Sequence, residues 1–316
     1  MYRAILLHLS VNLWEEKERP ENRGRAAVRN YQPFLRVDDR VWKEVVTRFA
    51  EIGGNLLVLD TEDAIVYKSH PEIAVENAWS REKLRQELKF CRDLGLEVVP
   101  KLNFSCCHDV WMGEFSHMVS SRPYYNFCKD LIEETVELFD GPKLFHVGLD
   151  EEAAEYQRNM EYIVVRQGQQ YYDDMHFYFD QVRKNGARPW MWADHIWFAG
   201  EEEFAANIPK DVIQSNWYYF QDFGPFSEAD WQDPERSIWA MRVKGYEQLT
   251  NLGYDQIPTG SSYAFDDNFA RTVDFCKQRI PAEHLLGFLQ SSWESLEWKN
   301  RDFQLQTVED MRNIQY

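Results

Sequence analysis

The chain alternates short apolar runs rich in β-forming residues with longer amphipathic segments, and this alternation restricts its fold more than any other feature. Apolar runs of about four to eight residues indicate buried strands, and apolar residues three and four positions apart indicate helices. Eight strands that are each followed by a helix predict an α/β fold, a single (β/α)8 TIM barrel. The runs expected to form strands are RAILLHLS (3–10), NLLVLD (55–60), LEVVPKLNF (96–104), KLFHVGLD (143–150), RPWMWAD (188–194), DVIQSNW (211–217), DQIPTGSS (255–262) and LLGFLQSSW (285–293).

The segments that follow the predicted strands are long, whereas the segments that return from helix to strand are short. Residues 11–39, 61–79, 105–121 and 218–234 are rich in aromatic or charged side chains, and returns such as ELFDGPKL and KNGARP are brief. A barrel carries its active site on the face where its strands have their carboxyl ends. The long βα loops therefore predict a functional site on that face. No linker marks a boundary, so residues 1–316 are expected to form one catalytic domain.

The net charge of the 316-residue chain is -18, which disfavours two classes of partner. An acidic protein is repelled by phosphate backbones and by anionic membrane surfaces, so neither nucleic acid nor membrane is expected as a partner. No apolar run of about 18 residues predicts a membrane span. The opening MYRAILLHLS passes directly into charged residues, which predicts a strand rather than a secretory signal.

The cysteines and the aromatic residues narrow the function further. Five cysteines without CxxC spacing predict reduced thiols in a cytoplasmic protein, and neither a metal nor a cofactor is expected. The chain contains 12 Trp, 16 Tyr and 20 Phe, and many of the tryptophans lie near the ends of predicted strands. Many of these rings belong in a core, but flat rings also bury the apolar faces of pyranose sugars. A small carbohydrate is therefore the expected ligand.

The stretch KLFHVGLDEE (143–152) places acidic residues directly after the fourth predicted strand. Acids in the first turn of a helix favour the helix dipole, and this explanation would suffice for an isolated DEE. Here, however, the acids follow a strand at the catalytic face of a barrel. Because strand residues alternate sides, His146, Gly148 and Asp150 are expected on one face, with Val147 and Leu149 packed outward.

The other predicted strands also end in polar and aromatic side chains. Each of these residues has a structural explanation when it is taken alone. Together they are typical of a carbohydrate pocket, in which rings contact sugar faces and carboxylates bind hydroxyls. In strand order they are Asp60 and Asp63; His108 and Asp109; Trp192, Asp194, His195 and Trp197; Trp217, Tyr218 and Tyr219; Tyr263, Asp266 and Asp267; and Trp293 and Glu294.

HVGLDEE resembles the HxGxDE signature of family 20 glycoside hydrolases, the β-N-acetylhexosaminidases, which place an Asp-Glu pair at the end of barrel strand four. The segments RAILLHLS, VVPKLNFSCCH, SSYAFDD and SSWES resemble the first, third, seventh and eighth strand segments of that family. The resemblance therefore spans the whole barrel in the correct order. The chain departs from the family at Leu149, where a second Gly is usual, and at Lys101, where an acid is common.

The resemblance implies a retaining exo-glycosidase that removes terminal β-linked N-acetylhexosamine by substrate-assisted catalysis. In that reaction Glu151 is the general acid, Asp150 orients the 2-acetamido group, and Tyr263 holds the acetamido oxygen as it attacks the anomeric carbon to form an oxazolinium intermediate. A relay from His108 to Asp60 or Asp63 is expected to support Glu151. With the strand-end residues, the expected substrate-binding set is Arg3, His108, His146, Trp192, Asp194, Trp217, Asp266, Trp293 and Glu294.

Other classes of protein stay open at this point. A retaining glycosidase for sugars without a 2-acetamido group needs an enzymic nucleophile, for which Asp194 or Glu294 is the candidate. A non-catalytic sugar-binding barrel would keep the tryptophans but would not need the acids. A metallohydrolase would use His108, His146, Asp150 and His195 as ligands. The resemblance also allows a homodimer, because some barrels of this family complete the pocket with an aromatic residue of a neighbour.

Overall fold

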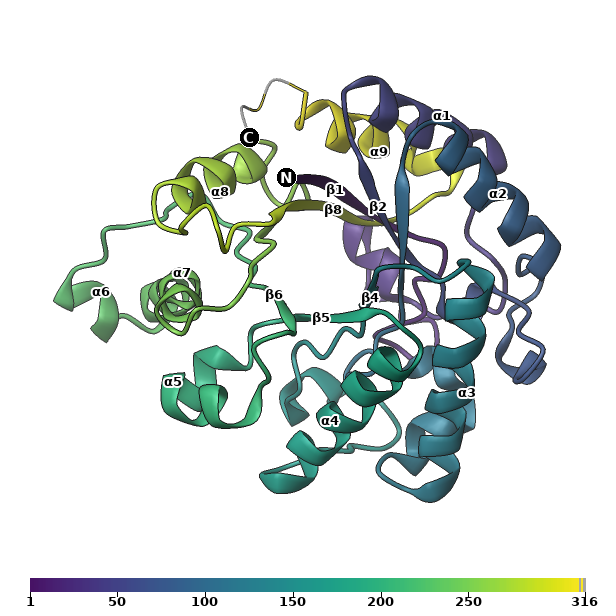
Figure 1. Cartoon of the computed structure of the whole chain (residues 1–316), viewed down its shortest axis with the longest axis horizontal. Coiled ribbons are helices and arrows are strands. Elements are labelled where there is room, and N and C mark those ends of the chain that lie inside the picture. The colour runs from purple at the N-terminus through teal and green to yellow at the C-terminus, as the bar shows by residue number, and fades with distance from the viewer. Residues whose placement is uncertain (313, 315–316) are drawn as a thin grey trace.

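The computed structural model describes residues 1–312 and 314, in which eight parallel strands form a barrel with helices on the outside (Figure 1). Hydrogen bonds join the strands in the order β6-β5-β4-β3-β2-β1-β8-β7, and parallel bridges Gln214–Gln256 and Trp217–Thr259 connect the two ends of the sheet. The predicted TIM barrel and its eight strands are confirmed. The strands are β1 (Tyr2–His8), β2 (Leu56–Asp60), β3 (Glu97–Lys101), β4 (Leu144–His146), β5 (Arg188–Trp192), β6 (Ile213–Ser215), β7 (Thr259–Ser261) and β8 (Gly287–Ser295).

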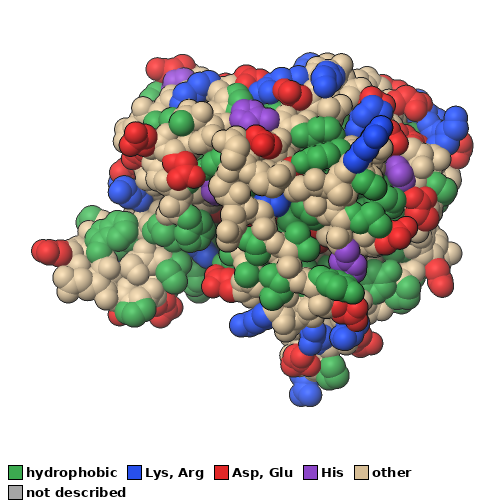
Figure 2. Space-filling view, turned by 90° about the horizontal axis from the view of Figure 1, so that it is seen from below, with side chains coloured by type: hydrophobic (Ala, Val, Ile, Leu, Met, Phe, Trp, Pro, Cys, Tyr) green, Lys and Arg blue, Asp and Glu red, His purple; other side chains and the backbone are tan. Residues whose placement is uncertain are grey.

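The helices surround the barrel, and the segment around α6 projects from it at the left of Figures 1 and 2. In the described part of the chain, no helix has the length and hydropathy that a membrane span requires. The α-helices are α1 (Asp39–Glu51), α2 (Arg81–Asp93), α3 (Arg122–Leu138), α4 (Gln169–Lys184), α5 (Ile196–Asn207), α6 (Glu228–Gln232), α7 (Pro234–Asn251), α8 (Asn268–Lys277) and α9 (Arg301–Glu309). The 3₁₀ helices are η1 (Gly24–Arg29), η2 (Glu62–Ala64), η3 (Pro71–Ile73), η4 (Val110–Met118), η5 (Ala154–Gln157) and η6 (Trp298–Asn300).

The strands bury both of their faces, as parallel strands covered by helices do. On β1, Ala4 and Leu6 point into the barrel, whereas Ile5 and Leu7 pack against the outer helices. The cluster inside the barrel also contains Trp190. This alternation is the physical reason that the strands appear in the sequence as nearly continuous apolar runs.

A buried ion cluster occupies the barrel at the carboxyl ends of β2 and β3. Lys101 is fully buried, and its Nζ lies 2.5 Å from Asp60 Oδ2 and 3.7 Å from Glu62 Oε1. His8 Nδ1 lies 3.0 Å from the same Asp60 oxygen. Burial acts to raise the pKa of Asp60, but Lys101 and His8 outweigh it and hold that pKa below its ordinary value. The lysine that departs from the family pattern is therefore the counterion of a strand-end aspartate.

The expected relay from His108 to Asp60 or Asp63 is wrong. Asp60 is held by Lys101 and His8, and Asp63 Oδ2 accepts a hydrogen bond of 2.8 Å from Asn12 Nδ2. Both aspartates thus have partners of their own in the barrel interior, and His108 contacts Asp150 and Glu151 instead.

Lys101→Met tests the ion cluster. The substitution keeps the volume of the side chain but leaves Asp60 as a buried carboxylate with one cationic partner fewer. Breaking a buried pair in this way costs about 3 to 5 kcal/mol, so the free energy of unfolding in urea should fall by that amount. Lys299→Met is the matched control, because Lys299 is 65% exposed and pairs with Glu297 on the surface. A change within about 0.5 kcal/mol is expected there, and an equal loss in both variants would contradict the assignment.

Candidate active site

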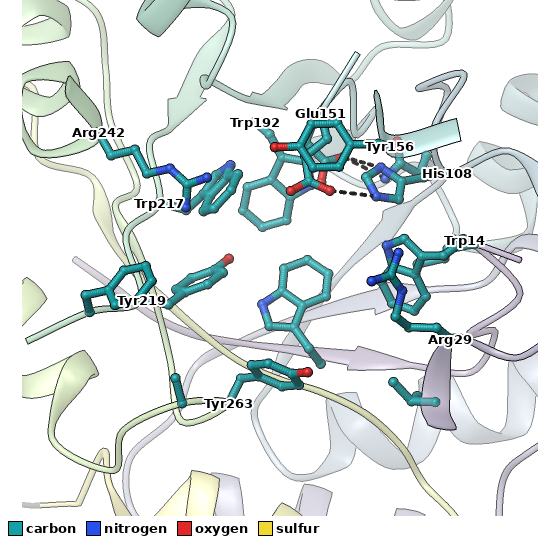
Figure 3. Close-up of a pocket in the computed structure, with 17 residues that line it drawn as sticks. Trp14, Arg29, His108, Glu151, Tyr156, Trp192, Trp217, Tyr219, Arg242 and Tyr263 are labelled. Atoms are coloured by element: carbon teal, nitrogen blue, oxygen red, sulfur yellow. Dashed lines mark hydrogen bonds and ion pairs between the residues drawn. The ribbon is translucent and has the colours of Figure 1, made fainter. Parts of the chain in front are cut away.

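A pocket of about 350 Å³ opens among the βα loops at the carboxyl-terminal face of the barrel (Figure 3). The ionisable side chains that line it are two carboxylates, one imidazole and two guanidinium groups. Its other walls are largely aromatic, which suits a ligand with apolar faces and a few polar groups. The ionisable residues are Asp150, Glu151, His108, Arg29 and Arg242, and the aromatic ones are Trp14, Tyr156, Trp192, Trp217, Tyr219, Phe220, Tyr263 and Trp293.

The chain turns sharply between β4 and the acidic residues. Gly148, Leu149 and Glu151 have φ angles of 71°, 75° and 57°, in the left-handed region. A Cβ atom at Gly148 would lie 2.0 Å from Asn103 Oδ1, so only glycine fits there. The strand therefore stops at His146, four residues earlier than predicted, although Leu149 packs into the outer cluster as expected. The turn directs the acids into the pocket.

His108 connects the two carboxylates that line the pocket. Its Nδ1 lies 3.2 Å from Asp150 Oδ1, and its Nε2 lies 3.3 Å from Glu151 Oε2. Figure 3 draws both contacts as dashed lines. Asn103 Nδ2 donates a further hydrogen bond of 2.9 Å to Asp150 Oδ1. The predicted catalytic residues Asp150 and Glu151 thus come together around one imidazole.

Electrostatics assigns opposite charges to His108 and Asp150. Burial acts to lower the pKa of His108, but the two carboxylates outweigh it and raise that pKa to about 10. Burial likewise acts to raise the pKa of Asp150, but His108 and the hydrogen bond from Asn103 outweigh it and lower that pKa to about 2. At neutral pH the imidazole is cationic and Asp150 is ionised.

Asp194 lies behind the acidic turn rather than in the pocket wall. Its Oδ2 accepts a hydrogen bond of 2.8 Å from the backbone N–H of Glu151, and Trp217 Nε1 lies 3.4 Å from its Oδ1. Burial, followed by the charge of Asp150, raises the pKa of Asp194 to about 7. Asp194 therefore positions both Glu151 and a tryptophan of the pocket.

Glu152 has a different role from the one expected of a first-turn acid. No α-helix begins at this point, and its carboxylate pairs with Arg166 Nε at 2.8 Å and accepts from the backbone N–H of Cys106 at 3.0 Å. Arg166 is itself buried and also pairs with Asp174. Glu152 thus ties the loop after β4 to the loop after β3.

The tryptophans predicted at strand ends surround the pocket with rings. Trp192 and Trp293 have ring centroids 5.8 Å apart, and Trp217 stacks on Tyr219 at 5.1 Å. Tyr263, the predicted holder of the acetamido oxygen, lines the opposite wall in Figure 3. Seven residues of the predicted catalytic and substrate-binding sets line one pocket: His108, Asp150, Glu151, Trp192, Trp217, Tyr263 and Trp293.

Five predicted substrate-binding residues do not line this pocket in the described part of the chain, and Asp194, behind the acidic turn, is one of them. Arg3 is the second residue of β1, at the amino-terminal end of the barrel beside Gly53, so it cannot contact a ligand at the opposite end. His146 is fully buried inside the barrel, with its ring 4.5 Å from that of Trp192. These two residues support the fold rather than the pocket wall.

Asp266 and Glu294 also lie outside the wall of the pocket. Asp266 is exposed on the loop after β7. Glu294 directly follows Trp293, whose φ of 51° turns the chain, and its carboxylate accepts hydrogen bonds of 2.9 Å from Ser295 N and Asn300 Nδ2. The ring of Trp293 enters the pocket, and the next side chain points away from it.

Sequence reasoning missed several residues that line the pocket. Trp14, Arg29 and Tyr156 come from the loops after β1 and β4, and Arg242 comes from α7. No periodicity marks such positions. Tyr219, by contrast, is one of the strand-end residues named from the sequence, and it lies two residues after Trp217, on the same face of an extended chain. Burial raises the pKa of the Tyr219 hydroxyl well above its ordinary value, and Asp150 and Glu151 add to that rise.

The pKa of His108 predicts how its contribution to stability varies with pH. A folded-state pKa near 10, above the unfolded value of about 6.5, means that the contribution is complete below pH 6.5 and is lost as the pH rises to 10. The free energy of unfolding should thus differ between wild type and His108→Gln by more than about 1 kcal/mol near pH 6.5, and the difference should shrink towards pH 10.

Urea unfolding across this pH range checks the expectation. His176→Gln, a half-buried histidine on α4, controls for effects common to the loss of any histidine. A difference that stays constant or grows with pH would contradict an imidazolium held between Asp150 and Glu151.

Comparisons with known proteins were made for the whole chain. No protein-family model and no curated protein sequence matches it. A family 20 β-N-acetylhexosaminidase from Streptomyces coelicolor A3(2) is structurally similar, with 15% identity and a TM-score of 0.63 over 98% of this chain and 64% of that chain. The chitobiase of Flavobacterium johnsoniae has 15% identity and a TM-score of 0.64 over 99% of this chain and 48% of that chain.

An exo-β-N-acetylglucosaminidase of family 20 from Vibrio harveyi, solved in complex with N-acetylglucosamine, has 12% identity and a TM-score of 0.60 over 98% of this chain and 54% of that chain. The chain thus spans 48% to 64% of the length of these three proteins. At such identities the likeness is one of fold. The resemblance to family 20 glycoside hydrolases predicted from HVGLDEE is confirmed at that level: the chain folds as their barrel does.

Proposed function

We propose that the chain is a retaining exo-glycoside hydrolase that removes terminal β-linked N-acetylhexosamine by substrate-assisted catalysis. The observation that carries the proposal is the pair Asp150 and Glu151, held by one imidazole at the wall of an aromatic pocket. Two adjacent residues on one side of a pocket do not flank a sugar from both faces, as the acid and the nucleophile of an ordinary retaining enzyme do. This favours a nucleophile supplied by the substrate itself.

Each of the three polar residues has its own role in the proposed reaction. Glu151 donates a proton to the glycosidic oxygen while the acetamido oxygen attacks the anomeric carbon, which breaks the glycosidic bond and forms the oxazolinium. Asp150, ionised at neutral pH, orients the acetamido N–H and stabilises the positive charge that develops there. Glu151 then accepts a proton from the water that opens the intermediate. His108 Nε2, 3.3 Å from Glu151 Oε2, supports both proton transfers.

The remaining pocket residues hold the sugar. Trp192, Trp217 and Trp293 supply flat rings for the acetamido methyl and the sugar faces. Tyr263 is the predicted donor to the acetamido oxygen, and Tyr219, one of the strand-end residues named from the sequence, is a second donor in the pocket lining. The similar Vibrio harveyi enzyme, which carries N-acetylglucosamine, agrees with a ligand of this class.

The rival glycosidase that acts on sugars without a 2-acetamido group is less well supported. Its candidate nucleophiles were Asp194 and Glu294. Asp194 is committed to Glu151 N and Trp217, and Glu294 is bonded to Ser295 N and Asn300, so neither carboxylate lines the pocket.

The proposal also includes the domain organisation and the cellular location of the protein. We propose that residues 1–316 form one catalytic domain of a cytoplasmic protein. The five cysteines are all buried and unpaired, which agrees with reduced thiols. The homodimer that the resemblance allows stays a prediction.

A panel of p-nitrophenyl glycosides tests the reaction type and the sugar class together. We expect release of p-nitrophenol from β-N-acetylglucosaminide or β-N-acetylgalactosaminide, and none from the matching glucoside and galactoside, because only the acetamido sugars carry the nucleophile. Equal turnover of sugars with and without the acetamido group would overturn the mechanism, and binding without turnover would favour a sugar-binding barrel.

Two substitutions assign the roles of the carboxylates. Glu151→Gln should reduce kcat by about 10² to 10⁴, the usual contribution of a general acid-base group. Asp150→Asn should reduce it comparably on the same substrate, because a neutral amide stabilises the oxazolinium nitrogen poorly. Glu294→Gln, which changes a carboxylate outside the pocket, is the control. Near-normal rates in Asp150→Asn would contradict the role of Asp150 as the partner of the acetamido group.

A cation-dependent hydrolase is the second candidate, because His108, Asp150 and Glu151 offer ligand atoms within 4.8 Å of one another. The other ligands expected for a metallohydrolase do not join them. His146 lies inside the barrel, and His195 Nε2 lies 2.9 Å from the Tyr172 hydroxyl. We therefore expect treatment with EDTA to leave the hydrolysis rate unchanged. Loss of activity that Zn²⁺ or Mg²⁺ restores would favour the metal-dependent reaction instead.

A further inference from the structure

Arg242 is a cation in the pocket wall for which the proposed mechanism has no use. It lies on α7, and its guanidinium carbon is 4.7 Å from the ring centroid of Trp217 and 4.9 Å from that of Trp197. Figure 3 shows it beside Trp217 at the edge of the pocket. Stacking on two rings holds the guanidinium plane in one position and leaves its N–H groups to face a ligand.

The packing of α7 brings this residue to the pocket. Asn216 Nδ2, just after β6, donates a hydrogen bond of 2.9 Å to the backbone carbonyl of Arg242. Gly245 lies one turn further along the same face of the helix, and a Cβ there would come within 2.9 Å of Asn216 Oδ1 and Trp197 Nε1. The helix can approach the strand end closely because this position has no side chain.

Within residues 1–312 and 314, no carboxylate oxygen lies within the 4.0 Å ion-pair distance of Arg242, and its Nε is buried without a hydrogen-bond partner. Another arginine on the same helix does have carboxylate partners. Arg236, six residues earlier, pairs with Asp222 at 2.5 Å and with Asp230 at 2.8 Å. In a protein with a net charge of -18, carboxylates are abundant, and Figure 2 shows them across the surface. Among the residues that the structure describes, Arg242 shares this lack of a carboxylate partner with Arg29, whose Nε is also buried without a hydrogen-bond partner, and both arginines line the pocket.

The charges around the pocket reinforce this contrast. Arg29, Arg242 and the protonated His108 contribute three positive charges to its lining, against two negative charges from Asp150 and Glu151 when both are ionised. The pocket thus has a net positive lining inside an acidic protein. A field of this sign attracts an anionic ligand.

We propose that the substrate carries a carboxylate or sulfate group and that Arg242 receives it. The planar guanidinium matches such oxyanions with two parallel hydrogen bonds. The inference rests on the proposed function for the reaction at the anomeric carbon, but not for the binding of the anion. Two sources of the oxyanion fit this chemistry: a sulfate on the terminal N-acetylhexosamine, or the carboxylate of a uronic acid in the leaving group.

Calorimetric titration of the full chain carrying Glu151→Gln tests the proposal without turnover. One pair of probes is N-acetylglucosamine and its 6-sulfate. The other pair is N-acetylglucosaminyl-β-1,4-glucuronate and the corresponding disaccharide with glucose. We expect the anionic member of one pair to bind about tenfold to a hundredfold more tightly than its neutral partner, as charge-assisted hydrogen bonds imply. The pair that shows the preference identifies the source of the oxyanion.

The dissociation constant of the neutral probe divided by that of the anionic probe measures the preference. Adding Arg242→Gln should bring this ratio close to one. Arg242→Lys keeps the charge but not the planar guanidinium, so it should leave an intermediate ratio. Arg236→Gln removes the same charge from the same helix outside the pocket, and it should leave the ratio unchanged. A preference that survives Arg242→Gln, a ratio near one in both pairs, or failure of every anionic probe to bind would overturn the proposal.

These outcomes are separable from failure of the proposed function. If no glycoside is hydrolysed by the wild-type chain but the anion preference depends on Arg242, the binding site stands and the reaction does not. If neutral N-acetylhexosaminides are hydrolysed but the ratio of dissociation constants is near one, the proposed reaction stands and the proposed anion site does not.

Discussion

Asn103 holds together the two strand ends on which the pocket depends. Its Oδ1 accepts a hydrogen bond of 3.2 Å from Leu149 N, and its Nδ2 donates one of 2.9 Å to Asp150 Oδ1. The contact requires Gly148, where any Cβ would collide with the amide. One side chain therefore binds both the backbone of the turn and the carboxylate of Asp150, so the turn also fixes the orientation of the acids. This orientation places both acids in contact with His108.

Leu149 adds strain to this turn, at a position where the resemblance leads one to expect glycine. A non-glycine residue in the left-handed region costs about 1 to 2 kcal/mol. The Leu149 side chain is fully buried in the outer cluster, and burial of a leucine stabilises by about 1.5 to 3 kcal/mol. Burial therefore offsets the strain, so this departure from the family pattern keeps the geometry of the acids.

Two buried charge clusters lie one above the other in the barrel, and each pairs its anions with its own cation. Lys101 neutralises Asp60 below the pocket, and His108 neutralises Asp150 at its wall. Lys101 also acts at a distance to lower the pKa of Asp150. Arg242 differs from both cations, because its pairing is with rings and its charge is left for a ligand.

The sequence by itself determined the barrel, its eight strands, and the strand ends that supply Asp150, Glu151, His108 and the pocket tryptophans. These features follow from periodicity and burial, which are local properties of the chain and can be read from neighbouring residues. Only the tertiary structure decided which side chains enter the pocket. Glu294 turns away because of the backbone at Trp293, and Arg242 enters from a helix with no distinguishing periodicity. Such directions depend on turns and partners far apart in the chain, where a single contact outweighs any local preference.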